Sequence, residues 1–575
     1  MGGKKIFDFA KLVINENSSI NELFKVLSIS INPNYGSGFA IVVDSNGEIV
    51  GTVQDSDIRK YLASKSVDGL KIQQVMRRDF ISVENDLSHD QVIDSIIDQM
   101  NNRGNWNTAL PVRVIPITKE KIPVGILDLE ELKERFSNRK SQHIVIGLGY
   151  VGLTLALVLT QVGKKVYGYE TNQEKVDLLR SGNSYIHEPG IGSLLKSKLN
   201  DSFFVEDNLS FLSQDFGIQR IFYICVGTPL KSNKSVNLEY IDAVISTIIK
   251  CIKPLDIIIM RSTVPVGTGQ KIIASVSGKL DWKVGADFHY ISAPERTVEG
   301  DALREIREIP QLIAGATIAC RSAGSRIFEE ISNSVVHLER IEAAELTKLM
   351  GNAFRDYIFG FSNHLIEVAK KIDLDINVLI KASNLGYSRS FIPLPSPGVG
   401  GPCLTKDSYL IYDSELDRKQ SPILAARKTN ELVIENSIKF IKLKCKDIKS
   451  YDCLVIGAAF KGVPETNDIR NSPSLEFISL LDNEVRSISV WDSTIPLQEA
   501  KALGKRWSTN FSMIAILNNN PKNLEYFFEQ YSKLIEKEII IFDPWQLIEP
   551  QRLILEKPSN LIHYFTLSKY LELKK

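Results

Sequence analysis

One cysteine, Cys403, directly follows a turn-forming stretch of two glycines and a proline, Gly400-Gly401-Pro402. Lys406 and Asp407 come three and four residues later. Glycine and proline at this density disfavour helix and strand, so we expect the sulfur on a loop. A thiol there can act as a nucleophile, and a nearby carboxylate can position water or accept a proton. The competing interpretation is a small, buried, chemically inert cysteine.

A dinucleotide site is indicated upstream by Gly147, Gly149 and Gly152, which lie between an apolar strand pattern and a helical pattern. Glycines at this spacing let backbone amides approach a pyrophosphate at the start of a helix. Glu170 ends the next predicted strand, where a carboxylate accepts from ribose hydroxyls and repels a 2′-phosphate, so NAD is favoured over NADP. The alternative is a glycine-rich packing turn. A hydride acceptor and a nucleophilic thiol together suggest two successive oxidations, from an alcohol through an aldehyde to an acid.

Lys348 and Asn352 lie four residues apart on a long helical pattern over 342–372, with Glu345 one turn earlier. This spacing places them on one helix face. Such a face is commonly solvated. If it points into a cleft, the ammonium and the amide become donors to an oxyanion.

The chain has 575 residues, which predicts three to four domains. It carries 69 basic and 69 acidic side chains and no basic run, which argues against nucleic acid as a partner. Its apolar stretches are shorter than a membrane span, and the N-terminus lacks a signal-peptide core. The six cysteines show no disulfide or zinc spacing. We therefore expect a cytoplasmic protein without membrane or metal.

The first ~135 residues repeat approximately. Each half reads as a helix, a strand, a turn, a strand and a helix, at 20–27, 41–43, 49–51 and 57–59, and again at 92–100, 112–117, 123–127 and 131–132. This pattern resembles a tandem pair of cystathionine-β-synthase (CBS) domains over 1–137. The resemblance implies an α+β regulatory module that binds an adenine nucleotide, with Asp57 as the ribose ligand; Glu131 stands where the second unit usually has Asp. The alternative is a docking module without a ligand.

A polar linker over 137–142 separates this module from a chain in which strands alternate with helices. The predicted strands lie at 143–146, 165–169, 220–226, 256–261, 288–293 and 311–314, and later at 453–457, 488–492 and 539–543. This alternation predicts α/β architecture with parallel, doubly wound sheets. We expect two Rossmann-like domains, at 142–338 and 449–575, joined by a helical connector at 339–442.

Several blocks in one order resemble the UDP-glucose/GDP-mannose dehydrogenase family, the nucleotide-sugar 6-dehydrogenases. They lie at 147–152, 226–229, 262–268, 293–300, 348–352, 400–407, 457–461 and 468–473. The resemblance implies that Cys403 traps the aldehyde as a thiohemiacetal and that Lys348 and Asn352 stabilise oxyanions. It further implies that Asp407 and Thr263 hold the hydrolytic water and that Glu295 is the base in thioester hydrolysis.

The same resemblance implies the binding residues. NAD would be contacted by Gly147, Gly149, Tyr150, Val151, Gly152, Glu170, Lys175, Thr228, Glu299 and Arg470. The substrate would be contacted by Arg355, Gly401, Lys461 and Arg389, the last across the interface of a homodimer or higher oligomer.

The substrate is less closely defined. Residues 352–356 and 389–403 resemble the UDP-N-acetylhexosamine branch, but Lys406-Asp407 is retained as in the UDP-glucose and GDP-mannose enzymes. The stretch 542–545 lacks an arginine often found there. We expect oxidation of a UDP-N-acetylhexosamine, or secondly of UDP-glucose, to a uronic acid for surface polysaccharide. The alternatives are a single-step β-hydroxyacid dehydrogenase and a non-catalytic nucleotide sensor.

Overall fold

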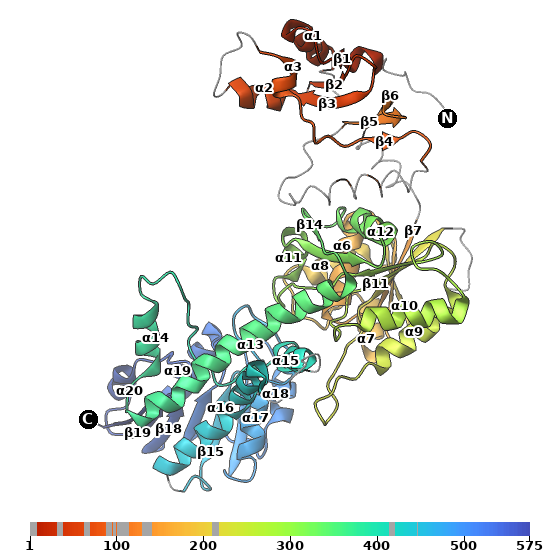
Figure 1. Cartoon of the computed structure of the whole chain (residues 1–575). Helices are drawn as coiled ribbons and strands as arrows, with labels where there is room; N and C mark the ends of the chain where they lie inside the picture. The colour runs from red at the N-terminus through yellow and green to blue at the C-terminus, as the bar shows by residue number, and fades with distance from the viewer. Residues whose placement is uncertain are drawn as a thin grey trace. The chain divides into compact units, whose positions relative to one another are not determined.

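The computed structural model describes residues 9–30, 38–62, 70–87, 95, 99, 114–128, 141–209, 218–412, 420–445 and 447–574 (Figure 1). The chain divides into two compact units. One contains residues 1–141 with 315–327, and the other contains 142–314 with 328–575.

The N-terminal unit holds two small sheets with the same order and strand directions. In the first, β1 (Val13–Asn15) is parallel to β2 (Phe39–Val43), which is antiparallel to β3 (Ile49–Gln54). The second repeats this with β4 (Val83–Glu84), β5 (Val114–Lys119) and β6 (Ile122–Asp128). The short 3-10 helix at Phe9–Leu12, α1 (Ile20–Ser30), α2 (Asp55–Leu62) and α3 (Ile72–Val75) complete the described elements. Apart from Ser95 and Gln99, the predicted helices at 92–100 and 131–132, Glu131 and the linker to residue 140 lie outside the described residues.

The first lobe of the second unit is built on an eight-stranded sheet in the order β14-β13-β12-β11-β10-β7-β8-β9. Its strands are β7 (Ser141–Ile146), β8 (Val166–Tyr169), β9 (Phe203–Glu206), β10 (Gln219–Ile224), β11 (Ile257–Met260), β12 (His289–Ser292), β13 (Gln311–Gly315) and β14 (Val335–His337). Every residue of β11 is buried, as expected for a parallel strand covered on both faces. The order reverses between β7 and β10, and ligands of such sheets bind at this point.

The helices of this lobe follow the strands in sequence. They are α6 (Tyr150–Gln161), α7 (Gln173–Arg180), α8 (Ile191–Lys198), α9 (Glu239–Cys251), α10 (Thr268–Leu280) and α11 (Ala302–Glu308). The helix after β13, α12 (Ile318–Phe328), falls almost entirely within residues 315–327 of the N-terminal unit. Strands and helices alternate as predicted. The short strands β9 and β14 were not predicted.

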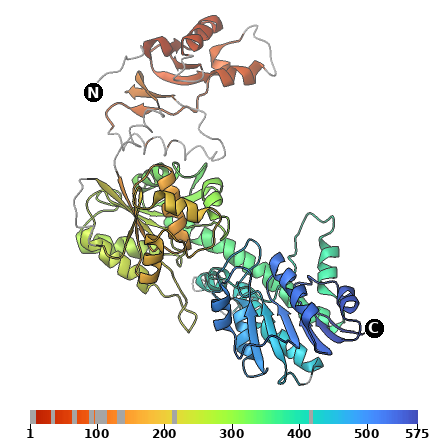
Figure 2. The same cartoon turned by 180° about the vertical axis from the view of Figure 1, so that it is seen from behind.

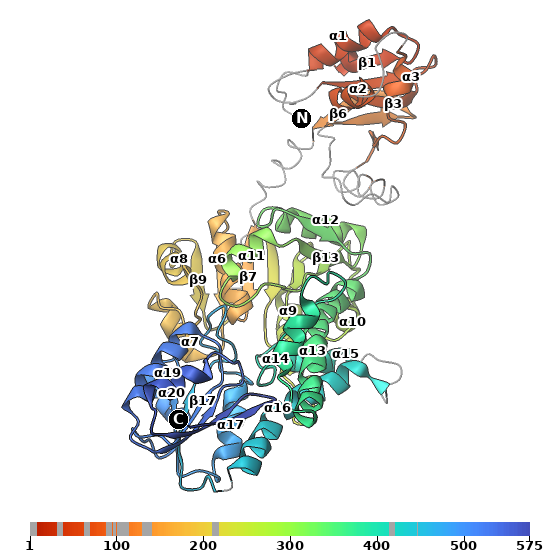
Figure 3. The ribbon, with the colours of Figure 1, turned by 90° about the vertical axis from the view of Figure 1, so that its left-hand side faces the viewer.

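The connector contains α13 (Ile341–Lys371), α14 (Ile376–Asn384), α15 (Leu404–Tyr412) and α16 (Pro422–Lys444). Helices α13, α15 and α16 pack together (Figure 3). A Cβ on Gly360 of α13 would lie 2.6 Å from Ala426 Cβ, so α16 approaches α13 closely. α13 has two apolar faces, one buried and one exposed. Leu349 and Ala353 are buried. The second, the α13 apolar face, is exposed and consists of Leu346, Met350, Phe354, Tyr357, Phe361, Val368 and Ile372.

The second lobe has a six-stranded sheet in the order β16-β15-β17-β18-β19-β20, parallel except for β20 (blue in Figure 2). Its strands are β15 (Asp452–Ile456), β16 (Ser487–Trp491), β17 (Met513–Ile516), β18 (Glu538–Phe542), β19 (Leu561–Phe565) and β20 (Tyr570–Leu573). Its helices are α17 (Pro473–Leu481), α18 (Leu497–Leu503), α19 (Pro521–Lys533) and α20 (Pro550–Glu556). Within the described part of the chain, no helix combines the length and hydropathy of a membrane span.

Candidate active site

A cleft of about 1580 Å³ opens within the second unit, where the first lobe faces the connector and the second lobe. It lies at the carboxyl ends of β7 and β10, the switch point of the eight-stranded sheet. The predicted site residues that line it are Gly147, Gly149, Tyr150, Val151, Glu170, Lys175, Thr228, Thr263, Glu295, Glu299, Lys348, Cys403 and Arg470. The predicted dinucleotide loop and the predicted nucleophile thus share one cleft.

The glycine loop has room for a pyrophosphate. Gly147 has φ +90°, and a Cβ on Gly152 would lie 1.9 Å from Gly147 O, so both glycines are required by the protein's own backbone. A Cβ on Gly149 would meet nothing within 4 Å, and Gly149 begins α6 without a side-chain cap. The Glu170 carboxylate is held at the end of β8 by the amides of Leu148, at 3.2 Å, and Thr171, at 2.9 Å. An open helix start beside a fixed carboxylate fits NAD.

The matching turn of the second lobe is closed. Asp492 Oδ2 accepts from the amides of Ala458, at 2.7 Å, and Ala459, at 3.0 Å. A Cβ on Gly457 would lie 2.7 Å from Asn518 Cγ. Because the protein's own side chains satisfy these amides, this turn does not offer the cradle present in the first lobe.

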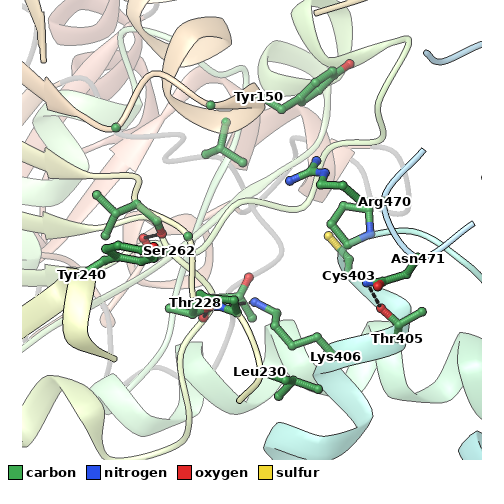
Figure 4. A pocket seen from close by; sticks show the side chains of 18 of the residues that line it. Tyr150, Thr228, Leu230, Tyr240, Ser262, Cys403, Thr405, Lys406, Arg470 and Asn471 are labelled. Carbon is green, nitrogen blue, oxygen red and sulfur yellow. Dashed lines mark hydrogen bonds between the residues drawn. The ribbon is translucent and has the colours of Figure 1, made fainter. Parts of the chain in front are cut away.

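Cys403 lies on the loop just before α15, and its carbonyl accepts from the amides of Lys406 and Asp407. The helix begins at Leu404, directly after the cysteine. The Cys403 side chain is exposed to the cleft, next to Arg470 (Figure 4). Desolvation by the surrounding walls raises the pKa of the thiol, and the charge of Asp407 raises it further, whereas Lys348 and Lys406 lower it.

Two glycines press this loop against the second lobe. Gly401 has φ +91°, and its Cβ would lie 2.8 Å from the Phe460 ring. A Cβ on Gly400 would lie 2.6 Å from Asn471 O. Gly401 does not line the cleft, so its contact with Phe460 explains why a glycine is required at this position.

Lys406 joins the cysteine loop to the first lobe. Its Nζ donates to Thr228 Oγ1 at 2.6 Å, and that hydroxyl donates to Thr263 O at 2.7 Å (Figure 4). The sequence analysis gave Lys406 no role. Its position between Cys403 and Asp407 could have indicated that it contributes to the site.

Asp407 and Asn352 are not among the side chains that line the cleft. Asp407 is fully buried, and its Oδ2 accepts from Asn352 Nδ2 at 2.6 Å. Its Oδ1 has no hydrogen-bond partner among the described residues and lies 3.7 Å from Lys406 Nζ. Asp407 Oδ1 can therefore still accept a hydrogen bond close to Cys403.

Glu295 is buried and lines the cleft, and its carboxylate accepts from Arg261. Burial raises the pKa of Glu295, but the charge of Arg261, the amides of Thr297 and Arg296 and the charge of Lys348 lower it below the ordinary value. Glu295 is therefore held as a carboxylate near Lys348.

Comparison with known proteins agrees with this geometry. Three domains of the UDP-glucose/GDP-mannose dehydrogenase family match the chain: the NAD binding domain at 142–332, the central domain at 342–432 and the UDP binding domain at 454–550. The chain belongs to the UDP-glucose/GDP-mannose dehydrogenase family. A CBS domain matches residues 10–64, so the CBS resemblance is confirmed for the first repeat, and the second remains a prediction.

Known proteins of similar sequence align with most of this chain. UDP-N-acetyl-D-mannosamine dehydrogenase of Pyrococcus horikoshii is 31% identical over 73% of this chain and 97% of its own length. The enzyme of that name from Campylobacter jejuni is 32% identical over 64% of this chain and 90% of its own. The solved UDP-D-ManNAc dehydrogenase of Pyrococcus horikoshii superposes with a TM-score of 0.64 at 26% identity, over 74% of this chain and 99% of that one. The chain is thus an NAD-dependent nucleotide-sugar dehydrogenase, as predicted.

In this dehydrogenase, Glu299 links the two lobes. Lys461 Nζ donates to Glu299 O at 2.8 Å, and Thr466 Oγ1 donates to Glu299 Oε2 at 3.4 Å. Arg470 lies 3.7 Å from Glu299 Oε1. Burial lowers the pKa of Lys461 and the charge of Arg355 lowers it further, whereas the charges of Glu299, Glu188 and Cys403 raise it; neither Lys461 nor Arg355 lines the cleft.

Sequence reasoning missed Glu188, which is buried at 7% exposure. Its carboxylate accepts from Tyr150 Oη, from Gly300 N at 2.9 Å and from Leu303 N at 3.1 Å. It therefore fixes the turn that carries Glu299. A carboxylate directly before Pro189-Gly190 was the available signal.

Two further predicted binding residues, Arg389 and Asp57, are not among the residues that line the cleft. Arg389 is exposed, with its guanidinium 6.0 Å from the Tyr387 ring centroid, and does not line the cleft of its own chain. Asp57, in the N-terminal unit, accepts from Gln54 N at 3.0 Å and Arg77 Nε at 2.6 Å. A ribose at Asp57 would have to share this carboxylate with Arg77.

Proposed function

We propose that this dehydrogenase oxidises the primary alcohol of a nucleotide sugar to a uronic acid in two steps on one site. The observation that carries the proposal is that Cys403 lines the same cleft as the open Gly147–Gly152 loop. UDP-N-acetylhexosamines are the preferred substrates, because the relatives named above are UDP-N-acetyl-D-mannosamine dehydrogenases; UDP-glucose is second. The uronic acid would serve surface polysaccharide synthesis.

The Gly147–Gly152 loop, Glu170 and Lys175 would hold NAD, which would accept one hydride in each oxidation, so a second NAD would have to replace the first NADH. The Cys403 thiolate adds to the aldehyde carbon, a C–S bond forms, and the carbonyl electron pair becomes an oxyanion that Lys348 stabilises. Oxidation of this adduct leaves a thioester. Covalent attachment prevents the aldehyde from escaping between the two steps.

Hydrolysis completes the reaction. Water, held by Asp407 and Thr263, attacks the thioester carbon while Glu295 takes its proton, and the C–S bond breaks to return the Cys403 thiolate and the acid. Lys461 of the second lobe and Arg355 of α13 would bind the substrate diphosphate. The charge of Arg355 lowers the pKa of Lys461, as two neighbouring cations do, and a diphosphate between them would relieve that repulsion.

The test is a panel of UDP- and GDP-sugars incubated with NAD, in which NADH and product are counted together. We expect two NADH per uronic acid and inactivation by a thiol reagent. One NADH per product without thiol dependence would favour the β-hydroxyacid dehydrogenase alternative. Cofactor binding without turnover on any sugar would favour the sensor.

A second copy of the chain would cover the α13 apolar face. Phe354 is 63% exposed and Met350 is 54% exposed, and the nearby segment contains Leu385 at 86% and Phe391 at 78%. An exposed apolar surface of this kind is typical of a self-association site. Arg389 belongs to the same 385–391 segment, so a partner could bring it to a cleft that it does not reach in its own chain.

The N-terminal unit would bind an adenine nucleotide and change the activity. The CBS match over 10–64 and the half-buried Asp57, which pairs with Arg77, support this proposal. Deletion of residues 1–137 should abolish any response of the oxidation rate to AMP, ADP or ATP, and Asp57→Asn in the full chain should weaken it. An unchanged response in the deletion variant would contradict the proposal.

A further inference from the structure

Arg261 is a buried cation that contacts the reaction's proposed base. It directly follows β11, is 1% exposed and contributes to the wall of the cleft. Its Nη1 donates to Ala293 O at 2.7 Å and to Gln311 Oε1 at 3.1 Å. Its guanidinium lies 5.2 Å from the Phe328 ring centroid, and its Nη2 donates to Glu295 Oε2. These contacts fix the guanidinium from several sides, so it cannot turn away from Glu295.

The Glu295 carboxylate is fixed equally well. Its Oε1 accepts from Arg296 N at 2.7 Å and Thr297 N at 3.0 Å, and its Oε2 accepts from Arg261. A carboxylate has about four acceptor positions, so these three donors leave about one for a water in the cleft. Arginine stays protonated at every working pH, and a buried carboxylate beside it stays ionised.

We propose that Arg261 is a positioning residue for the hydrolytic step, which keeps Glu295 ionised and directs its unoccupied acceptor position toward the cleft. The inference rests on the proposed function, because Glu295 is the base there. Arg261 acts through Glu295, so its effect should fall on thioester hydrolysis and not on the two oxidations that precede it. If Arg261 had only a structural role, its substitution would lower stability without slowing hydrolysis more than the two oxidations.

The experiment compares Arg261→Met, Glu295→Gln and the double variant in the full chain with NAD and a UDP-sugar. Arg261→Met should slow turnover about 10- to 100-fold at pH 7, because less of Glu295 would be ionised and able to accept the proton. Both oxidations should still run once, so mass spectrometry should find acylated Cys403. Because the lost cation had lowered the pKa of Glu295, turnover should recover as pH rises. Arg261→Lys should be intermediate in rate and in the amount of acylated Cys403.

Arg220→Met is the matched control. Arg220 is also buried in the first lobe and pairs with Asp256 at 2.6 Å, but neither residue lines the cleft. This variant should lower the melting temperature without accumulation of acylated Cys403.

The double variant decides whether Arg261 acts through Glu295. In the Glu295→Gln background, Arg261→Met should change turnover less than about twofold. A further tenfold loss there, a pH profile that does not move, or an Arg261→Met enzyme without acylated Cys403 would overturn the assignment. If Arg261→Met does not fold, the pH profile of Arg261→Lys decides. Wild-type hydrolysis by Glu295→Gln alone would instead remove Glu295 as the base of the proposed function.

Discussion

Asn352 Nδ2 donates a 2.6 Å hydrogen bond to Asp407 Oδ2, which ties the middle of α13 to the first turn of α15, directly behind Cys403. Asp407 is fully buried, and its Oδ1 has no hydrogen-bond donor among the described residues. The amide of Asn352 thus satisfies one carboxylate oxygen and leaves the other for a ligand, such as the water that the proposed hydrolysis needs.

Asn352→Ala should therefore impair both stability and turnover. A buried carboxylate oxygen without its donor costs about 1–3 kcal/mol, so the melting temperature should fall. Turnover should fall about tenfold or more, because Asp407 would no longer be fixed. Asn523→Ala is the control, since Asn523 is a buried amide that donates to Asn518 Oδ1, and neither residue lines the cleft. Equal loss of turnover in both variants, at equal melting temperature, would show that Asn352 has only a structural task.

Cys403→Ser should abolish uronic acid formation while leaving NAD binding intact. The serine hydroxyl is a far poorer nucleophile than the thiol at neutral pH. The Gly147–Gly152 loop, which forms the NAD cradle, belongs to the first lobe, whereas Cys403 belongs to the connector. Steady-state acid production and NAD titration by calorimetry measure the two properties. Cys251→Ser is the control, because Cys251 is partly exposed but does not line the cleft. Normal acid production by Cys403→Ser would reject covalent catalysis.

Lys406→Met should make Cys403 less reactive. The charge of Lys406 lowers the pKa of the thiol, so its removal raises that pKa and leaves less thiolate at a given pH. Iodoacetamide labelling of Cys403, followed by peptide mass spectrometry at pH 7 to 9, should be several-fold slower and should recover at higher pH. Lys231→Met is the control: Lys231 also lines the cleft, but it pairs with Glu239. Equal labelling rates in the wild type and Lys406→Met would contradict this electrostatic effect.

Local patterns predicted the parts of the site that are contiguous in sequence. The Gly147–Gly152 loop and the Cys403 turn were recognisable because glycine and proline restrict the backbone wherever they occur. The periodicity of α13 located the helix, but it could not show that Phe354 would be exposed while Ala353 is buried, since that depends on where α16 packs. Partners distant in sequence, such as Lys406 with Thr228, are chosen by tertiary packing and leave no local pattern.

Glu345→Gln should change how stability depends on pH. Glu345 is 2% exposed and accepts from Gly267 N at 2.6 Å and Gly269 N at 2.8 Å. Burial raises its pKa to about 7, although these two amides lower it; Glu342 raises it further. Because the folded-state pKa exceeds the unfolded one, the wild type loses stability as pH rises from about 4.5 to 7, by about 3 kcal/mol at most.

The variant lacks this titration. The melting temperature of the wild type should therefore fall relative to that of Glu345→Gln over that pH interval, and the difference should then level off. Glu342→Gln, on the same helix and more exposed, is the control, because the pKa of Glu342 is lowered and its loss should not give this slope. A difference that is flat from pH 4.5 to 8 would show that Glu345 does not titrate near neutrality.

The α13 apolar face should hold two copies of the chain together. Phe354→Asp would place a charge in the middle of that face and should convert the protein to monomers in sedimentation velocity experiments. Leu555→Asp is the control, because Leu555 is 78% exposed on α20 and is not part of the α13 apolar face. A Phe354→Asp protein that still sediments as the wild-type oligomer would exclude the α13 apolar face as the interface.

Mixed oligomers then test whether Arg389 acts on the partner's cleft. Cys403→Ser chains have no nucleophile, and Arg389→Ala chains should bind substrate poorly, so each preparation alone should be nearly inactive. After both are unfolded and refolded together, mixed dimers pair the intact Cys403 of one chain with the intact Arg389 of the other. If Arg389 serves the partner, activity should recover in these dimers, because one complete cleft is rebuilt. If Arg389 serves its own chain, no chain has both residues in one cleft, and mixing should restore nothing.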